Sequence, residues 1–572
     1  MNGRPRQTSF IRGLVAVAGL SYLALFAWTG LLVGTAETAF RSGRFDEAHS
    51  DLSRAAFWPV RRGRVLDALG VVDLARDRPE EARLHLRAAR ARWLRPAAFG
   101  EEHVLRGFLA EGRLGPALVY AEHRHGIRPT PALSYYLAVA EAGMNRIDDA
   151  EAHLVEATGS PALRARAERL RRTLEARRRT GRSDYLFDRR GAPLAGKELR
   201  SGRDLMLAPE IAPLIAGPRE DLIGAGDAGV RLSVDLDIQK AAQAALGKRR
   251  GGIVVLDVST GAVLAAASGP PLRPRGSPPI ALTRHYEPGS IVKMITLSAA
   301  LRQGIDVKAL FPMDCPGTIL IDGVPFRDWA AHKRVGSIEH AVEVSCNIAF
   351  GRLGALVGAA ALDAELRRYG FGSRPDGDGR GGALRGGLHY EIGRLLAPDA
   401  SHPRFALARR AEGLDSLTIT PIHAALVAAG LARGGDPPSP HIVAQRVDLL
   451  GEVRDEAVAR RPDPGLSPDQ VDLITDCMLR AVRGPQGTAR RAGVEGVEAA
   501  MKTGTSGESP PGLDGLVIGY APARRPVLAW AVVAEAAGKA EWEAARITRD
   551  LLSRIQDQLR SSARRTPPAK RS

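Results

Sequence analysis

One apolar run around a single lysine constrains the fold of this chain more than any other stretch. The Pro288-Gly289 pair breaks the chain, and Ser290 follows, a residue that is favoured at a helix start. From Ser290 to Leu301 the only charged residue is Lys293. A helix that is apolar on nearly every side is a buried helix. We therefore expect a helix from Ser290 to about Gln303 that holds Lys293 in a poorly solvated place, three residues after the serine.

This arrangement predicts an activated nucleophile. Burial disfavours the ammonium form of a lysine, and the positive end of a helix does the same. A neutral Lys293 amine could accept the proton of the Ser290 hydroxyl. Because Ser-x-x-Lys is a short pattern that also occurs by chance, the rest of the sequence has to support the interpretation.

The N-terminal segment favours a membrane anchor. Arg4, Arg6 and Arg12 precede an uncharged run over 14–34, which is close to the ~20 residues that cross a bilayer. Positive charge before the span keeps residues 1–13 in the cytoplasm and sends the rest across. A cleaved signal peptide is the alternative, but its apolar core is normally about 7–15 residues long. We expect an uncleaved, single-pass anchor with the bulk of the chain in the periplasm.

Four similar pieces recur after the anchor. Their closing alanines are spaced by 34, 35 and 33 residues, and the pieces are Gly43–Ala48, Asp77–Ala82, Gly112–Ala117 and Asn145–Ala150. A turn followed by a helix with a small residue, at a period near 34, resembles the tetratricopeptide repeat. An irregular helical spacer is the alternative. In either case stacked helices over 36–179 would offer a concave surface to partner proteins.

Composition narrows the partners and cofactors. The net charge of +17 is spread along the whole chain, without an aromatic-basic patch, so we expect no nucleic acid. An anionic membrane surface or wall polymer fits the charge as well. Cys315, Cys346 and Cys477 form no C-x-x-C pair, which argues against a metal site, and their disulfide state stays open.

The C-terminal half has the pattern of an α+β unit. Strand-like runs cover Ile253–Asp257, Val263–Ala267, Ala499–Ser506, Gly515–Tyr520 and Val527–Ala534, and an amphipathic helix covers Trp542–Leu559. A long and mostly helical insert that begins near Ser290 separates the two strand groups. We expect an antiparallel sheet flanked by helices, a helical lobe, and a site between them.

Two further motifs accompany the Ser-x-x-Lys pattern. Ser345-Cys346-Asn347 follows a helix-like segment, and Lys502-Thr503-Gly504-Thr505 lies on a predicted strand. With these three motifs in this order, the chain resembles the penicillin-binding protein transpeptidase family, in its monofunctional, class B-like form. The resemblance covers about 184–558.

The resemblance implies a reaction and a set of roles. Ser290 would attack the carbonyl between two D-alanines of a peptidoglycan stem peptide, and Lys293 would accept its proton. Ser345 would relay a proton to the leaving amine, and Asn347 would bind the substrate backbone and fix Lys293. An amine of a neighbouring strand would then resolve the acyl-enzyme, so the enzyme would be a D,D-transpeptidase that β-lactams inhibit covalently.

The third motif would bind the substrate. Lys502 would add positive potential, Thr503 would offer a hydroxyl to the terminal carboxylate, and Gly504 would let the substrate lie against the strand edge. The backbone N–H groups of Ser290 and Thr505 would form the oxyanion hole. The resemblance implies no metal and no organic cofactor.

The chain departs from the family pattern at two places, Ile291-Val292 and Glu412–Asp415, and neither departure removes a reacting group. The Glu-Asp-x-x-Phe-x-x-His pattern of the glycosyltransferase-fused class is absent, so we expect a single activity, with a separate membrane enzyme as the glycan polymerase and the repeats contacting it or other cell-wall proteins. A D,D-carboxypeptidase, a β-lactamase, or a β-lactam sensor whose site only binds remain alternatives.

We therefore predict six segments. They are a cytoplasmic N-terminus (1–13), a transmembrane anchor (14–34), tetratricopeptide-like repeats (36–179), a linker or pedestal (180–230), a transpeptidase domain (231–560) and a disordered basic tail (561–572).

Overall fold

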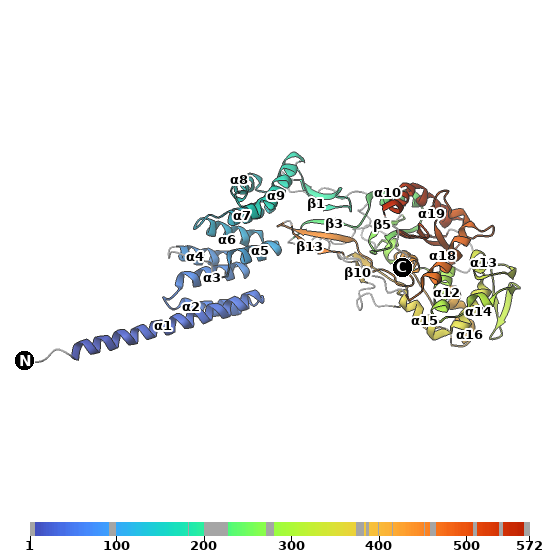
Figure 1. Ribbon diagram of the computed structural model, residues 1–572, viewed down its shortest axis with the longest axis horizontal. Helices are drawn as coiled ribbons and strands as arrows, with labels where there is room; N and C mark the ends of the chain where they lie inside the picture. The colour runs from blue at the N-terminus through green and yellow to red at the C-terminus, as the bar shows by residue number, and fades with distance from the viewer. Residues whose placement is uncertain are drawn as a thin grey trace, which may run out of the picture.

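The computed structural model describes most of the chain. The described ranges are 6–90, 99–180, 182–198, 227–269, 279–372, 382–384, 388–398, 400–414, 416–450, 452–457, 465–506, 512–536 and 542–565. The termini 1–5 and 566–572 and most of the linker predicted over 180–230 therefore lie outside the described residues. The molecule is elongated, with the N-terminal helices at one end and the C-terminal sheet and lobe at the other (Figure 1).

The N-terminal helix α1 runs from Arg6 to Arg41. Among the described residues, its part over Ala18–Arg41 is the one helix long and apolar enough to cross a membrane. That finding fits an anchor or a signal sequence. The helix continues past the predicted end of the span at Gly34, because Ala36 and Ala39 are buried against the next helix.

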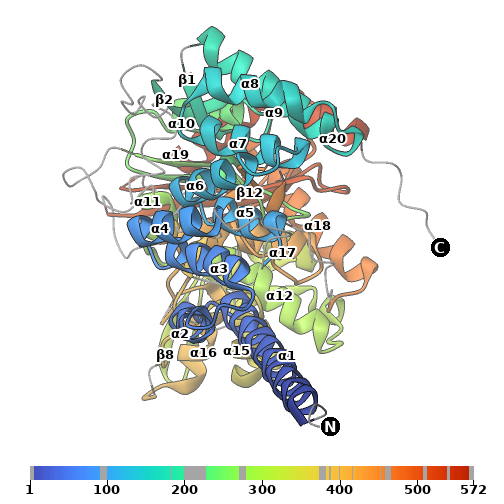
Figure 2. The same ribbon diagram turned by 90° about the vertical axis from the view of Figure 1, so that its left-hand side faces the viewer.

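Eight further helices form the N-terminal region. They are α2 (Phe45–Ala56), α3 (Arg62–Ala75), α4 (Pro79–Arg90), α5 (Glu101–Ala110), α6 (Leu114–His125), α7 (Pro131–Gly143), α8 (Ile147–Ala157) and α9 (Pro161–Thr180). From α1 to α4 and from α5 to α9, consecutive helices pack against each other, and all of them contribute to one apolar core (Figures 1 and 2). The short connections within these two groups fit the pattern of helical hairpins.

The four recurring sequence pieces adopt one recurring turn. Gly43, Asp77, Gly112 and Asn145 all have positive φ, between 57° and 72°. The residue after each of them, an arginine every time, donates its backbone N–H to a carbonyl five residues earlier, at 2.8–2.9 Å. This bond closes a Schellman-type helix end. The closing alanines Ala48, Ala82, Ala117 and Ala150 are fully buried, because a larger side chain would push the paired helices apart.

A first sheet lies between the helical region and the rest of the molecule. Its order is β13-β12-β3-β1-β2, with bounds β1 (Arg182–Phe187), β2 (Pro193–Glu198), β3 (Asp227–Leu232), β12 (Val443–Asp448) and β13 (Val453–Glu456). We call this first sheet the pedestal. Residues 443–456 belong to it, although the sequence analysis placed them in the transpeptidase domain over 231–560. They join the pedestal because β12 pairs with β3, with Arg446 opposite Val230 and Val443 opposite Leu232.

The second sheet is antiparallel throughout, as expected for the α+β unit. Its order is β14-β15-β16-β4-β5, with bounds β4 (Gly251–Asp257), β5 (Val263–Ser268), β14 (Ala500–Ser506), β15 (Asp514–Ala521) and β16 (Leu528–Ala534). Helices α10 (Leu236–Leu246) and α19 (Glu543–Arg554) pack against each other and against this sheet. Helix α17 (Pro421–Ala432) contacts β4, β15 and β16. All seven residues of β16 are buried, which fits a central strand covered on both faces.

A mostly helical lobe packs beside the free edge strand β14. Its helices are α12 (Lys293–Arg302), α13 (Ile338–Glu343), α14 (Asn347–Val357), α15 (Ala359–Arg368), α16 (Pro403–Glu412) and α18 (Pro468–Arg483). Two small strand pairs complete the lobe: β6 (Met313–Cys315) pairs with β9 (Lys333–Val335), and the hairpin β7 (Thr318–Ile321)–β8 (Val324–Arg327) lies between them in the chain. The remaining elements are α11 (Ile280–Thr283), β10 (Gly382–Leu384), β11 (Leu388–Tyr390), α20 (Gln556–Arg565) and the 3₁₀ turns at Gly289–Ile291, Val307–Leu310 and Arg490–Ala492.

The turn between β12 and β13 joins the helical region to the pedestal (Figure 1). Leu450 is 6% exposed and belongs to the core of the helical region. The Tyr135 hydroxyl donates to the Leu450 carbonyl at 3.1 Å. Glu452 forms ion pairs with Arg106 at 2.6 Å and Arg166 at 2.8 Å. Apolar packing of Leu450, with Leu449 beside it, and three polar contacts therefore hold this junction.

Candidate active site

The Ser-x-x-Lys motif forms the entrance to helix α12. A 3₁₀ turn over Gly289–Ile291 holds Ser290, and α12 begins three residues later at Lys293. The turn is held against strand β14, since a Cβ on Gly289 would lie 2.4 Å from the Thr505 carbonyl oxygen. The Gly289 N–H donates to the Gly413 carbonyl at 3.0 Å, so the turn is fixed from two sides.

Lys293 is buried, as the sequence predicts. Its side chain is 0% exposed, and residues 293–301 of α12 are buried on every side. The Nζ atom donates to the Ser345 carbonyl and to Oδ1 of Asn347, both at 2.6 Å, and lies 3.3 Å from the Ser345 hydroxyl. Burial lowers the pKa of Lys293, and the carboxylates of Glu412 and Asp328 partly oppose this shift.

Ser345 lies between two lysines. Lys502, on β14, is also 0% exposed and donates to the Ser345 hydroxyl at 3.0 Å and to the Thr503 carbonyl at 2.9 Å. Burial, and next the charge of Lys293, lower the pKa of Lys502 well below its usual value. Ser345 itself has φ of 55°, an uncommon conformation for a residue with a side chain. Two buried amines thus meet at one hydroxyl.

The Lys-Thr-Gly segment is fixed by the elements around it. The Thr503 hydroxyl donates to the Thr488 hydroxyl at 2.8 Å. A Cβ on Gly504 would lie 2.6 Å from the Pro288 carbonyl oxygen and 3.0 Å from Ile291. The sequence analysis explained the absence of a side chain at Gly504 by the approach of substrate. In the structure, a side chain there is already excluded by the close packing of β14 on the turn that carries Ser290.

A pocket of about 260 Å³ opens at the meeting point of the three motifs. Its lining contains the predicted residues Ser290, Ser345, Asn347, Thr503 and Thr505, together with Gly289, Trp329, Glu412, Leu414, Thr488 and Leu513. The two buried lysines reach the pocket through their hydrogen bonds to Ser345 and Asn347. Gly504 lies where β14 packs against the turn that carries Ser290.

Glu412 lines the pocket, but the sequence analysis gave it no chemical role. It stands at the departure from the family pattern over Glu412–Asp415, of which the last residue lies outside the described part. The Glu412 side chain is buried in the pocket wall, and its Oε2 atom has no hydrogen-bond partner among the described residues. Burial raises its pKa to about 7, although the charges of Lys293 and Arg409 oppose the shift.

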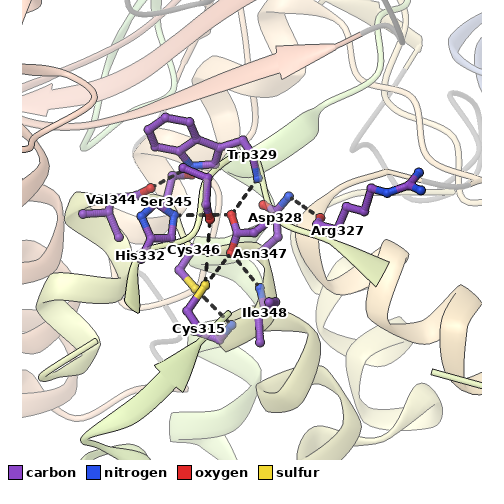
Figure 3. A network of polar contacts seen from close by, with 12 residues as sticks. Cys315, Arg327, Asp328, Trp329, His332, Val344, Ser345, Cys346, Asn347 and Ile348 are labelled. Carbon is purple, nitrogen blue, oxygen red and sulfur yellow. Dashed lines mark hydrogen bonds and ion pairs between the residues drawn. The ribbon is translucent and has the colours of Figure 1, made fainter. Parts of the chain in front are cut away.

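The three cysteines are reduced and buried. Cys477, on α18, lies apart, while Cys315 and Cys346 approach each other beside Asp328 and His332, behind the Ser345–Asn347 turn (Figure 3). These four side chains are the group in the described part of the chain that could hold a metal ion. Their spacings of 13, 4 and 14 residues match no common metal motif, so sequence inspection could not find them.

The chain has clear relatives over its C-terminal part. Residues 251–553 match the family described as the penicillin binding protein transpeptidase domain. The chain is 28% identical over 331 residues to peptidoglycan D,D-transpeptidase PbpA of Mycobacterium tuberculosis, covering 51% of this chain and 63% of that protein. It is 26% identical over 355 residues to peptidoglycan D,D-transpeptidase MrdA of Acinetobacter baumannii, covering 53% and 50%. The chain thus spans less than two thirds of these relatives.

Solved structures share the fold. The D,D-transpeptidase domain of a peptidoglycan glycosyltransferase from Eggerthella lenta superposes with a TM-score of 0.57 at 25% identity, covering 66% of this chain and 99% of that one. Penicillin-binding protein A from M. tuberculosis, as its penicillin G acyl-enzyme complex, gives 0.55 at 23% identity, covering 66% and 99%.

Proposed function

The chain belongs to the penicillin binding protein transpeptidase family, and on that premise we propose that it is a peptidoglycan D,D-transpeptidase with Ser290 as nucleophile. The observation that carries the proposal is the fully buried Lys293 amine, bonded to Ser345 and Asn347 at the pocket that Ser290 lines. The substrates are the D-Ala-D-Ala end of one stem peptide and an amine of another.

Acylation begins with proton transfer. The neutral Lys293 amine takes the proton of Ser290, and Oγ attacks the carbonyl carbon of the penultimate D-alanine. The C–N bond to the terminal D-alanine breaks, and the leaving amine takes a proton from Lys293 through the Ser345 hydroxyl. Burial suits Lys293 to this task because it lowers the pKa of the amine and so favours its proton-accepting form.

Two donors stabilise the charge that develops on the substrate carbonyl. We assign the backbone N–H groups of Ser290 and Thr505 to this oxyanion hole, in which one donor is typically worth about 3–4 kcal/mol. We assign the hydroxyls of Thr503 and Thr488, which are bonded to each other, to the binding of the terminal carboxylate. Lys502 adds positive potential there and holds the Ser345 hydroxyl at 3.0 Å.

The acyl-enzyme is resolved by an amine or by water. In transpeptidation the acceptor amine attacks the ester carbon, its proton passes to Lys293, and Ser290 regains a proton as its C–O bond breaks. β-Lactams acylate the same serine. Hydrolysis is a second candidate activity, favoured by Glu412: a carboxyl with a pKa of about 7 in the pocket wall can accept a proton from water, which then attacks in place of the amine.

We further propose that the N-terminal region is a tetratricopeptide-like scaffold behind a membrane anchor. The repeated positive-φ turns and buried alanines support the repeat, and α1 supports the anchor. The catalytic unit would then face the periplasm. The scaffold surface would bind a membrane glycan polymerase or other cell-wall proteins, which supply the strands to be cross-linked.

Labelling with fluorescent penicillin tests the nucleophile. We expect the full chain to be labelled and Ser290→Ala to lose labelling while its melting temperature is retained. Ser553→Ala is the matched control, since Ser553 is exposed and its hydroxyl donates to the Arg549 carbonyl of the same helix. Persistent labelling of Ser290→Ala would rule out Ser290.

Product analysis separates the two activities. The chain is incubated with a D-Ala-D-Ala stem peptide and a D-amino acid acceptor, and the exchanged and hydrolysed peptides are measured by mass spectrometry. We expect exchange to exceed hydrolysis, and Glu412→Gln to reduce the hydrolysed fraction. A chain that only hydrolyses the donor would refute the transpeptidase assignment in favour of a carboxypeptidase.

A further inference from the structure

The turn between α2 and α3 packs against the middle of helix α1. A short turn separates α1 from α2, so α2 runs back along the helix that precedes it. In the turn that follows α2, Trp58 makes an edge-to-face contact with Trp28 of α1, with 6.5 Å between the ring centroids. The guanidinium carbon of Arg61 lies 3.7 Å from the centre of the Phe26 ring. A Cβ on Gly30 would meet the same guanidinium at 3.2 Å.

This contact lies within the apolar span of α1. An anchor of about 20 residues that begins after Arg12 ends near Leu32. Trp28 then lies about 6 Å inside that end, at the rise of about 1.5 Å per residue of an α-helix. The exposed apolar surface of α1 also continues past the contact, because Leu31 is 64% exposed. The α2–α3 turn therefore lies at a depth where lipid surrounds the anchor.

The aromatic side chains around this contact face outward. Phe57 is 80% exposed and Trp28 is 43% exposed, and the rings of Phe57 and Trp58 meet edge to face at 5.2 Å. All three rings line a groove of about 730 Å³ beside α2, to which Arg54 also contributes. Exposed apolar clusters mark interaction surfaces, and tryptophan is enriched where a membrane meets water.

The cations around the turn have no acidic partners. No acidic residue occurs over 52–66, and the arginines of this segment are Arg54, Arg61, Arg62 and Arg64. Within the described part of the chain, their side chains form no ion pair and no hydrogen bond, and Nε of Arg64 is buried without a partner. By contrast, Arg76 at the end of α3 pairs with Asp46 at 2.9 Å. Guanidinium groups bind phosphate oxygens through paired N–H donors, so phosphate groups fit this charge pattern.

We propose that the α2–α3 turn lies in the periplasmic interface of the membrane and binds the phosphate groups of anionic phospholipids. The rings of Trp28, Phe57 and Trp58 lie at the level of the headgroups. The guanidinium groups of Arg54, Arg61 and Arg62 reach the lipid phosphates, as long basic side chains do at membrane interfaces. This inference rests on the proposed membrane anchor, which places α2 and α3 on the periplasmic side.

The lipid contact would fix the helical region against the membrane. A lone transmembrane helix tilts and rotates until packing and interfacial side chains set its orientation. Here α2 and α3 pack on α1 or on each other, and all three helices contribute to one apolar core. A turn held at the interface beside α1 therefore sets the tilt of the whole helical region relative to the bilayer.

Spin labelling measures the depth of the turn in the full chain. The three native cysteines are buried, so a nitroxide reagent would modify only an introduced cysteine. Pro59→Cys reports on the turn, Leu23→Cys on the anchor, and Val155→Cys on an exposed site of α8. The chain is placed in nanodiscs of phosphatidylglycerol and phosphatidylcholine. We expect the ratio of oxygen to nickel-complex collisions to be roughly threefold or more higher at Pro59→Cys than at Val155→Cys, as for an interfacial site.

The Leu23→Cys label separates this inference from the proposed anchor. If that label lies in lipid while Pro59→Cys is as open to the nickel complex as Val155→Cys, the anchor stands and the interfacial turn is wrong. Shielding of the Pro59→Cys label from both reagents would mean that protein covers the turn, which also overturns the proposal. If the Leu23→Cys label faces water, the anchor and the interfacial turn fail together.

Removal of two charges tests the phosphate contact. The double variant Arg61→Gln, Arg62→Gln should retain roughly fivefold less phosphatidylglycerol than wild type in native mass spectrometry. The control Arg171→Gln, Arg178→Gln removes the same charge from α9, where both arginines pair with acidic side chains, and should retain the wild-type amount. Equal retention by the two double variants would overturn the binding of lipid phosphate by the turn.

Discussion

Glu412 is the side chain through which pH acts most directly on the proposed base. When Glu412 is ionised, its charge favours the ammonium form of Lys293, and when it is protonated this effect is lost. The two groups share the pocket region and titrate in a coupled way. A residue outside the three motifs therefore contributes to the electrostatic environment of the proposed base.

Replacing this carboxyl should change stability in a pH-dependent way. The pKa of Glu412 is about 7 in the folded state, above its usual value of 4.5. Its contribution to the free energy of unfolding is therefore fully present below pH 4.5, and it is lost as the pH rises through 7. We expect Glu412→Gln to be more stable than wild type at pH 8, by about 1–3 kcal/mol, and unchanged at pH 4. Denaturant unfolding at both pH values measures this.

The exposed Glu495 provides the control for this experiment, and Glu495→Gln should shift stability little at either pH. A Glu412→Gln variant that is less stable than wild type at pH 8 would mean that the ionised carboxylate is satisfied in solution, contrary to the unpaired oxygen seen here.

At the scale of elements, the site depends on how closely β14 packs on the turn that carries Ser290. Gly504 faces Pro288, Gly289 faces Thr505, and a Cβ on Gly413 would lie 1.9 Å from the Gly289 carbonyl oxygen. These contacts involve backbone atoms, which cannot rotate away as a flexible side chain could. The nucleophile is thus positioned by three glycine contacts between different elements.

Gly504→Ala should separate positioning from folding. Its Cβ would meet the Pro288 carbonyl oxygen at 2.6 Å, so β14 or the turn must shift. We expect the rate constant for penicillin acylation to fall at least tenfold with little change in melting temperature. Gly336→Ala, where a Cβ finds its nearest neighbour at 4.0 Å, is the control. Wild-type acylation by Gly504→Ala would show that this packing is not required.

The sequence predicts the motif residues at the pocket better than it predicts the neighbouring side chains and strand pairings around them. The three motifs contain five of the residues that line the pocket, Ser290, Ser345, Asn347, Thr503 and Thr505, because short-range pattern and family order are visible in the chain. Glu412 escaped notice because one unpaired oxygen is a tertiary property. The clustering of Cys315, Asp328, His332 and Cys346 escaped for the same reason, and strand pairing of 443–456 with β3 depends on long-range register.

At the scale of the whole molecule, the β12–β13 turn links the catalytic part to the helical region. Leu450 reaches the helical core, and Glu452 pairs with arginines of two different segments. A buried apolar anchor surrounded by ion pairs resists rotation of one part against the other. Helix α1, the helical region and the catalytic part therefore follow one another along the long axis (Figure 1).

Leu450→Ala should loosen this junction without affecting the pocket. Truncating a buried leucine typically costs about 2–5 kcal/mol, and here the loss should appear as faster hydrogen exchange in α7 and in the β12–β13 turn. Penicillin acylation should stay at the wild-type rate. Val453→Ala is the matched control, since Val453 lies in the same hairpin and is 51% exposed. Unchanged exchange in Leu450→Ala would show that the junction is held elsewhere.

The role of the Lys293 amine can be measured directly by intact-protein and peptide mass spectrometry after timed exposure to penicillin G. Wild type should carry one adduct, on Ser290, and Lys293→Ala should acylate at least a thousandfold more slowly while retaining a cooperative unfolding transition. An adduct on another residue, or wild-type acylation by a folded Lys293→Ala chain, would contradict a buried amine as the base.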